Sequence, residues 1–316
     1  MLLWGNVKIE KTQERTSHMN TTDYGNLNAH TIGVTLKEIV RRAMEEIHKR
    51  RINCTGYDKK VDYKPGQEDR VTDADIAAQG IFIRKLEECF PGFGIVAEEQ
   101  GFSRPCTLKG TQLFFTVDPL DGTKAFERRQ SHGFGPMLSL STDEEVIAAF
   151  VGEIMTGELY YYRPESPKVH RLNFRDHQCE SLKIDEERPL ATQYVLLRDN
   201  PLDLPESYRQ IAQSTKHGGY FKDIEINGGG IGTGMARLWK GEVGAYITKP
   251  GLQTPWDLLP VWGISEKLGF LWCHMKPDQG LDFFERSLKP SMKKVRFDEP
   301  TIIIHRSRLS DFTKHS

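Results

Sequence analysis

The sequence predicts an α+β protein built from stacked layers of helices and mixed β-sheets. Stretches with apolar residues at helical spacing alternate with short β-prone runs, so both kinds of element are expected. Their order follows no strict βαβ repeat, which favours stacked layers over a barrel. No internal repeat of about 20–50 residues is present, which excludes a solenoid or a propeller. A length of 316 residues allows a full core and two subdomains.

Composition and charge describe an ordinary globular chain. Hydrophobic residues make up 38%, charged residues 28%, and the net charge is −1. A charge this close to zero gives no electrostatic basis for binding a nucleic acid polymer or a membrane. The five cysteines form no CxxC pair, which argues against a zinc site or a disulfide framework. No apolar run approaches the roughly 18 residues of a membrane span and the start is not a secretory signal, so we expect a cytoplasmic protein.

A polar arm followed by two helices is expected at the start of the chain. Residues 1–33 are polar without periodicity, which predicts a mobile arm. Thr35 and Glu38 form a capping box that predicts the start of the first helix. The apolar face of this helix consists of Leu36, Ile39, Val40, Ala43 and Ile47. Residues 52–70 read as a loop, and the second helix is expected at 73–90. Its inward residues are expected to be Ile76, Ile83 and Leu86.

Short strands dominate the middle of the chain, and strands and helices mix after it. Strands are expected at 95–97, 114–117, 137–140, 146–151, 159–162, 194–197 and 244–247. Helices are expected at 206–214, 235–239 and 257–268. Charged residues at 166–189, with room for one short strand, predict a boundary between subdomains at 34–190 and 191–316. The first subdomain would carry most of the acidic residues described next. The second would supply Asp257 and the residues on the substrate side of the site.

The strongest chemical signal is the segment VDPLDGT at residues 117–123. Asp118 and Asp121 stand three residues apart, and Gly122 and Thr123 follow directly. The apolar run before the segment predicts the end of a strand, and the residues after it predict a helix. Carboxylates at a strand end, followed by a tight turn and a helix N-terminus, favour a site for a metal ion and a phosphate together.

Other acidic residues lie at the edges of other expected elements. Asp73 and Asp75 belong to a helix start, Glu98 and Glu99 close a strand, and Asp257 begins the last long helix. Taken singly, each has an ordinary explanation as a helix cap or a loop residue. Two Mg²⁺ ions about 4 Å apart require carboxylates from several elements. The joint pattern therefore favours metal-assisted phosphoryl transfer to water, and no side-chain nucleophile is evident.

Four segments carry a resemblance to a known family. DRVTDAD at 69–75, VAEEQ at 96–100, VDPLDGT at 117–123 and TPWDLLP at 254–260 occur in the order found in the inositol monophosphatase superfamily. This superfamily includes inositol phosphatases, fructose bisphosphatases, histidinol-phosphate phosphatases and 3′(2′),5′-bisphosphate nucleotidases. The resemblance covers roughly residues 35–270. It implies an α-β-α-β-α sandwich and a homodimer, and a phosphomonoesterase that requires Mg²⁺ and is inhibited by lithium.

The resemblance also implies a role for each matching residue. The implied ligands of two Mg²⁺ ions are Glu98, Asp118, the carbonyl of Leu120, Asp121 and Asp257, and Asp75 would help to hold a third, weaker ion. Glu98 and Thr123 would orient the attacking water, so Glu98, Thr123 and Asp75 are the implied catalytic residues. The backbone N–H groups of Gly122 and Thr123 would hold phosphate oxygens.

The substrate is indicated less sharply. Lys124 follows DGT as in bisphosphate nucleotidases, and Lys249 lies near the position where inositol enzymes carry a glutamate for ring hydroxyls. A lysine there suits a second anionic group better than a neutral ring. The glycine run at 227–234 departs from G-x-G-x-x-G and reads as a tight turn beside the substrate pocket. The expected substrate contacts are therefore Asp121, Lys124, Gly230 and Lys249.

These residues lean slightly towards 3′-phosphoadenosine 5′-phosphate as the substrate. The close alternative is an inositol 1-phosphate, and a histidinol phosphate or a sugar bisphosphate stays open. A catalytically idle binding protein is disfavoured, because a binding module has no need of so many converging like charges.

Overall fold

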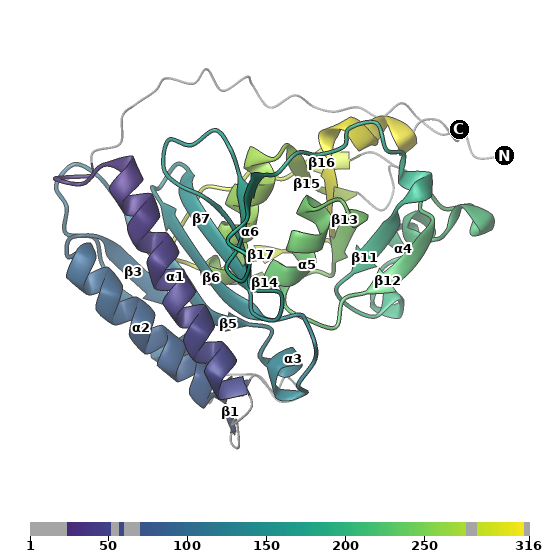
Figure 1. The fold of residues 1–316 in the computed structure, drawn as a ribbon. Coiled ribbons are helices and arrows are strands. Elements are labelled where there is room, and N and C mark those ends of the chain that lie inside the picture. The colour runs from purple at the N-terminus through teal and green to yellow at the C-terminus, as the bar shows by residue number, and fades with distance from the viewer. Residues whose placement is uncertain (1–23, 52–56, 60–69, 276–282, 313–316) are drawn as a thin grey trace.

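The computed structural model describes residues 24–51, 57–59, 70–275 and 283–312, arranged in five layers (Figure 1). Helices α1 (Ala29–Arg51) and α2 (Asp73–Cys89) cover one face of an eight-stranded sheet. Helices α5 (Ile231–Trp239) and α6 (Pro255–Lys267) lie between this sheet and a six-stranded sheet. Helix α4 (Glu206–Ala212) covers the far face of the second sheet. This order confirms the predicted α-β-α-β-α sandwich.

The first sheet has the strand order β10-β9-β8-β7-β6-β5-β3-β4. Its strands are β3 (Gly94–Ala97), β4 (Ser103–Arg104), β5 (Phe114–Asp121), β6 (Gly135–Ser141), β7 (Val146–Glu153), β8 (Glu158–Tyr162), β9 (His170–Asn173) and β10 (Cys179–Ser181). β3 and β5 are parallel and the other pairs are antiparallel, so the sheet is mixed. Every residue of β5, β6 and β7 is buried, because helices cover both faces.

The second sheet has the strand order β12-β11-β13-β18-β15-β16. Its strands are β11 (Tyr194–Leu197), β12 (Asp223–Ile226), β13 (Val243–Thr248), β15 (Phe270–Met275), β16 (Phe283–Glu285) and β18 (Thr301–His305). β11 runs parallel to both β12 and β13, so the carboxyl ends of these three strands meet at one edge. Two further pairs are β1 (Tyr57–Lys59) with β2 (Arg70–Thr72), and β14 (Gly251–Gln253) with β17 (Val295–Phe297).

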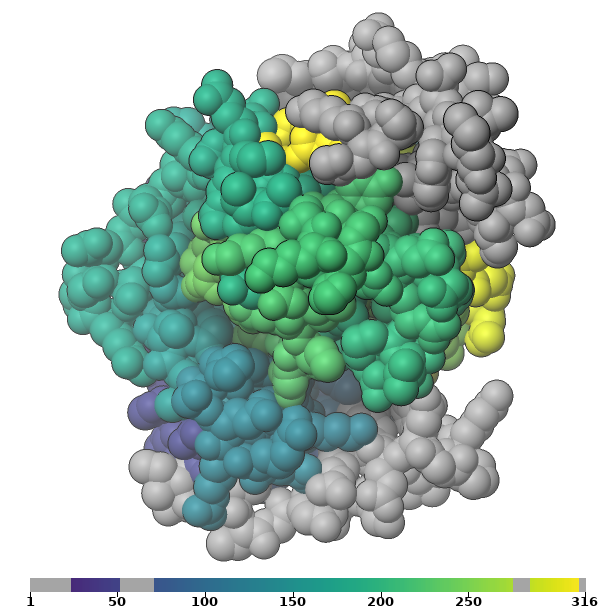
Figure 2. Space-filling view, turned by 90° about the vertical axis from the view of Figure 1, so that its right-hand side faces the viewer, coloured from purple at the N-terminus to yellow at the C-terminus, as the bar shows by residue number. Residues whose placement is uncertain are grey.

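Short helical segments complete the structure. They are α3 (Thr123–Glu127) and the 3₁₀ turns η1 (Glu99–Gly101), η2 (Leu190–Thr192), η3 (Pro201–Asp203), η4 (Thr215–His217) and η5 (Arg306–Phe312). Viewed from the side of α4 and β12, green residues of the later chain form the centre of the surface above blue residues of the earlier chain (Figure 2). No helix in the described ranges is long and apolar enough to span a membrane.

Three hydrophobic clusters hold the layers together, one for each interface. Leu36 and Phe82 belong to the cluster between the outer helices and the first sheet. Trp239 and Trp262 belong to the cluster between the sheets, around α5 and α6. Tyr208 of α4 belongs to the cluster on the far face of the second sheet. The middle cluster fixes α5 and α6 relative to β5, and the site described below depends on this.

The first helix begins earlier than predicted. α1 starts at Ala29 because the side-chain oxygen of Asn28 accepts the N–H of Thr31 at 2.9 Å, which caps the helix. Thr35 therefore lies inside the helix and is not its cap, and Glu38 forms ion pairs with Arg41 and Arg42 instead. The predicted mobile arm at 1–33 is wrong for its last residues, and residues 1–23 lie outside the described ranges.

Several other expectations need correction. Ile76 is 40% exposed, and α2 instead buries Ala74, Ala78 and Phe82 on the same side as Leu86. Parts of the expected loop at 52–70 form the strand pair β1–β2, and the expected loop at 166–189 contains the hairpin β9–β10. β15 and β18 were not predicted, although TIIIH is a plain β-prone run. The division into subdomains at 34–190 and 191–316 stays a prediction.

Candidate functional site

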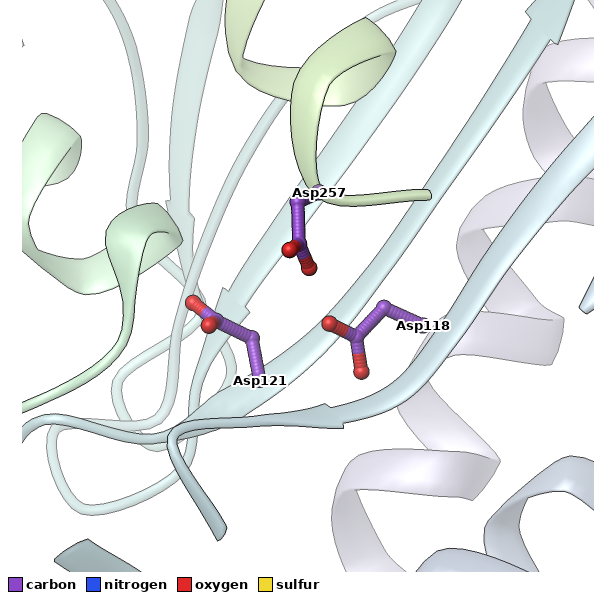
Figure 3. A group of neighbouring side chains, drawn as sticks. All are labelled: Asp118, Asp121 and Asp257. Atoms are coloured by element: carbon purple, nitrogen blue, oxygen red, sulfur yellow. The ribbon is translucent and has the colours of Figure 1, made fainter. Parts of the chain in front are cut away.

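Three aspartates from two distant parts of the chain converge at one point (Figure 3). Asp118 and Asp121 come from the end of β5, and Asp257 from the first turn of α6. One carboxylate oxygen from each residue lies within 4.8 Å of the others. Asp118 and Asp121 are buried, while Asp257 is half-buried. The group therefore forms a compact oxygen-lined centre.

An irregularity in β5 brings its two aspartates to the same side. In a regular strand, residues three apart point to opposite faces. The pairing of β5 with β6 shifts register between Asp118 and Asp121, at the position of Pro119, which has no N–H to donate. The N–H of Leu120 donates to Asp118 Oδ1 at 2.9 Å and holds that side chain against the bend. The sequence DPLD thus produces the convergence locally.

The glycine run positions Asp121. The N–H groups of Ile231 and Gly232, in the first turn of α5, donate to the two oxygens of Asp121 at 3.1 and 2.6 Å. A Cβ at Gly230 would lie 2.2 Å from Asp121 Oδ2, so only glycine permits this approach. α5 consequently begins at Ile231 rather than at the predicted Met235. Gly230 packs against Asp121, and a contact with substrate stays a prediction.

Asp257 is oriented by the start of α6. Thr254 is the N-cap, and its hydroxyl accepts the N–H of Asp257 at 3.3 Å. Pro255 occupies the first helical turn, where its missing N–H costs nothing. The Asp257 carboxylate then points away from the helix towards the end of β5.

The clustering of these carboxylates disfavours their charged forms. Burial raises the pKa of Asp118 well above its usual range, and the charges of Glu98, Asp257 and Asp121 add to this. Burial and the charge of Asp257 raise the pKa of Asp121 to about 7, although the N–H bonds from Gly232 and Ile231 oppose the shift. A divalent cation would remove this repulsion, and an all-oxygen donor set suits Mg²⁺, Ca²⁺ or Mn²⁺.

We expect the metal-free protein to lose stability as the pH rises from about 4 to 7. Over this window the folded state keeps a proton on Asp121 that the unfolded state, with an ordinary pKa near 3.8, has lost. The proton on Asp121 alone should therefore lower the free energy of unfolding by up to about 1.4 kcal/mol per pH unit until about pH 7, and the raised pKa of Asp118 adds to the fall. Thermal unfolding in EDTA from pH 4 to 8 measures this slope. An Asp121→Asn variant should show a smaller slope, and equal slopes for the two proteins would contradict the assignment.

Glu98 and Glu99 lie beside the three aspartates in different ways. The Glu98 carboxylate is half-buried and hydrogen-bonds with Asp118, so it adjoins the centre. The backbone of Glu99 is held by Gln79 of α2 through two hydrogen bonds of 2.8 Å. These two hydrogen bonds fix the turn after β3 and therefore the position of Glu98. Glu99 itself is buried.

Thr123 and Asp75 form a pair at the first turn of α3. The Thr123 hydroxyl lies 3.2 Å from Asp75 Oδ1 and 3.2 Å from the carbonyl of Leu120, and it can donate to either. Asp75 is fully buried and completes a capping box with Thr72, whose N–H donates to Asp75 Oδ2 at 2.8 Å. A residue that caps α2 is thereby also a partner of Thr123.

The structure also gives the surroundings of Gly122, Lys124 and Lys249. Gly122 has a φ of +87°, and a Cβ there would lie 2.2 Å from the carbonyl oxygen of Gly133, so the turn requires glycine. Lys124 is exposed on α3. Lys249 follows β13, and its ammonium lies 3.1 Å from Asp199 Oδ1.

Sequence reasoning missed Arg198, which directly follows β11. Burial works against its charge, but Tyr246, Asp257 and Asp121 act together to raise its pKa above the ordinary value. The signal in the sequence is a lone arginine after the apolar strand YVLL. The sequence alone does not show that β11 and β13 are neighbours, so nothing in it connected Arg198 with the aspartates.

Comparisons with known proteins find similar sequences and a similar fold. Residues 28–296 match the model of the Inositol monophosphatase family. An inositol-1-monophosphatase of Bacillus subtilis is 24% identical over 269 residues, which is 84% of this chain and 96% of that protein. The 3′(2′),5′-bisphosphate nucleotidase CysQ of Aggregatibacter actinomycetemcomitans is 29% identical over 35% of this chain and 44% of its own length. A solved IMPase/NADP phosphatase in complex with Mg²⁺ and phosphate has the same fold, with a TM-score of 0.65, 16% identity, and coverage of 91% and 95% of the two chains.

Proposed function

This chain belongs to the inositol monophosphatase family, and from that premise we propose that it is a Mg²⁺-dependent phosphomonoesterase that hydrolyses a small phosphorylated metabolite. Members of the family are phosphatases, so the reaction class is that of a phosphoric monoester hydrolase. The observation that carries the proposal for this chain is the convergence of Asp118, Asp121 and Asp257 within 4.8 Å. We further propose that it works in the cytoplasm as a homodimer.

The donor set fits Mg²⁺. All the donors are oxygens, and the pKa values of Asp118 and Asp121 are raised even though the charge of Arg198 acts on Asp121, so the cluster favours a bound cation. We assign two ions to Glu98, Asp118, the carbonyl of Leu120, Asp121 and Asp257, and a third, weaker ion to the neighbourhood of Asp75. When bound, Mg²⁺ would act as a Lewis acid that neutralises the charge on the transferred phosphoryl group.

The other residues position water and phosphate. When the Thr123 hydroxyl donates to Asp75, its oxygen can accept a hydrogen bond from the attacking water and fix the direction of attack. Glu98, next to Asp118, is placed to accept a proton from that water. The N–H groups of Gly122 and Thr123 would hold phosphate oxygens.

The proposed substrate is 3′-phosphoadenosine 5′-phosphate, with an inositol 1-phosphate as the alternative. Lys124, exposed on α3, and Lys249, directly after β13, supply two cations that suit a substrate with two phosphates. Gly230 and Asp121 would border the same substrate. The relatives include both an inositol-1-monophosphatase and a bisphosphate nucleotidase, so either substrate is consistent with the family.

A phosphate-release screen tests the function and separates the substrates. The purified protein is incubated with inositol, nucleotide, sugar and histidinol phosphates, each with Mg²⁺ and with EDTA. We expect release with Mg²⁺ only, highest for a nucleoside bisphosphate, and inhibition by millimolar lithium. Turnover of inositol 1-phosphate far above the bisphosphates would select the alternative, and no release from any ester with Mg²⁺ would refute the phosphatase assignment.

A further inference from the structure

Arg198 occupies a fixed position at the carboxyl ends of two parallel strands. Its N–H donates to the carbonyl of Ile247 in β13 at 3.0 Å. The carbonyl of Leu197 accepts the N–H of Asn227 at 2.7 Å, which attaches the loop before α5 to the same strand end. In open sheets, the crevice beyond the carboxyl ends of parallel strands is where ligands bind. The backbone of Arg198 is thus held at the edge where a ligand is expected.

The same loop connects Arg198 to the metal centre. The Asn227 side chain donates to the carbonyl of Gly230 at 3.0 Å and to the hydroxyl of Tyr246 at 3.4 Å. Ile231, the residue after Gly230, donates its N–H to Asp121. Arg198 and Asp121 therefore lie on two sides of one short, hydrogen-bonded loop. The guanidinium interacts electrostatically with Asp121 and Asp257, which places it near the position that the proposed function gives to the phosphate ester.

The Arg198 guanidinium has no hydrogen-bond or ion-pair partner among the described residues. The neighbouring cations differ in this respect: Lys249 pairs with Asp199 at 3.1 Å, and Arg128 donates to the carbonyl of Gly228 at 2.9 Å. Arg237 on α5 pairs with Glu225 and Glu242. A half-buried guanidinium with five donors and no acceptor is costly unless a ligand supplies the acceptor.

We propose that Arg198 binds a second phosphate group of the substrate, while the ester to be hydrolysed lies at the aspartate centre. The planar fork of a guanidinium binds a phosphate through two parallel hydrogen bonds, which a lysine cannot reproduce. Arg198 then selects bisphosphates over monophosphates. Lys249, which is already paired with Asp199, contributes at the edge of the binding site. This inference rests on the proposed phosphatase function and specifies its substrate class.

A purely electrostatic role is the competing explanation. Arg198 could serve only to offset the charges of Asp121 and Asp257. Its removal would then change the Mg²⁺ requirement and would slow the hydrolysis of every ester to the same extent. Substrate binding instead predicts an effect confined to substrates that carry the second phosphate.

Matched pairs of substrates distinguish these roles. One pair is adenosine 3′-phosphate and adenosine 3′,5′-bisphosphate, and another is glucose 1-phosphate and glucose 1,6-bisphosphate. Within each pair the compounds differ by one phosphate. The variants are Arg198→Gln and Arg198→Lys, with Arg209→Gln as the control, since Arg209 lies on α4 and pairs with the exposed Glu206. Thermal unfolding verifies that each variant is folded. If Arg198→Gln is not folded, the comparison is made with Arg198→Lys.

For Arg198→Gln we expect KM for the bisphosphate to rise about 10- to 100-fold, with kcat and the Mg²⁺ midpoint nearly unchanged. KM for the matching monophosphate should change by less than about 3-fold, and Arg198→Lys should lie between Arg198→Gln and the wild type. Equal effects on both members of a pair, or a shifted Mg²⁺ midpoint, would overturn the assignment of Arg198 and leave the phosphatase function standing. Absence of phosphate release by the wild type from all four compounds and from the wider screen would refute the proposed function itself.

Discussion

Replacing Asp118 with asparagine is expected to reduce phosphate release by at least about 10²-fold and to raise the stability of the metal-free protein. The activity falls because a neutral amide binds Mg²⁺ poorly and leaves charge on the transferred phosphoryl group uncompensated. The stability rises because asparagine removes a buried charge that Glu98, Asp257 and Asp121 all repel. Its side-chain oxygen can still accept the N–H of Leu120. The two effects have opposite signs, which a general folding defect cannot produce.

Steady-state kinetics with Mg²⁺ and thermal unfolding in EDTA at pH 8 measure the two effects. Asp143→Asn is the matched control, because Asp143 is exposed on the turn between β6 and β7 and should change neither quantity. Unfolding of the Asp118→Asn variant at a lower temperature than the wild type in EDTA would show that the aspartates do not repel one another as described.

Replacing Gly230 with alanine is expected to damage the site through a single added methyl group. The added Cβ would lie 2.2–2.3 Å from the carboxylate atoms of Asp121. Asp121 cannot turn aside without losing its bonds to Ile231 and Gly232. Gly230 has a φ of −71°, an ordinary value for alanine, so steric overlap is the cause. We expect a loss of about 1–3 kcal/mol in stability, and a loss of about 10²-fold in activity from the displaced ligand.

Gly80→Ala is the matched control for this substitution. Gly80 is exposed within α2, and a Cβ there would meet nothing within 4 Å. Alanine in the middle of a helix should stabilise the protein by about 0.5–1 kcal/mol and leave activity unchanged. Wild-type kinetics and melting temperature for Gly230→Ala would contradict the described approach of α5 to Asp121.

The chemistry of the site was more predictable from the sequence than its surroundings were. Asp118 and Asp121 could be identified because VDPLDGT contains its own strand end and turn. Asp257 and Glu98 stood out at the edges of other expected elements, but their role as ligands came from the resemblance, because their spacing along the chain carries no information about convergence. Asp75 taken singly fitted a helix cap, and the resemblance added a role in holding a third ion. The structure shows that it caps α2 and contacts Thr123.

The errors arise where tertiary contacts override local patterns. The helical pattern suggested that Ile76 faces inward, yet α2 is rotated so that Asp75 and Gln79 reach the site and Ile76 is exposed. The glycines before Met235 suggested a loop, but α5 includes Gly232 and Gly234, and the N–H of Gly232 donates to Asp121. Arg198 was overlooked because its significance depends on the pairing of β11 with β13.

Hydrolysis is proposed to depend most on a metal ion that the three aspartates hold. Phosphate release from the best ester of the screen, measured in EDTA and across a Mg²⁺ titration for the wild type and Asp257→Asn, tests this directly. We predict no release in EDTA, saturable activity with Mg²⁺, and a loss of at least about 10²-fold for Asp257→Asn at saturating Mg²⁺. Full activity of the wild type in EDTA, or of Asp257→Asn with Mg²⁺, would contradict it.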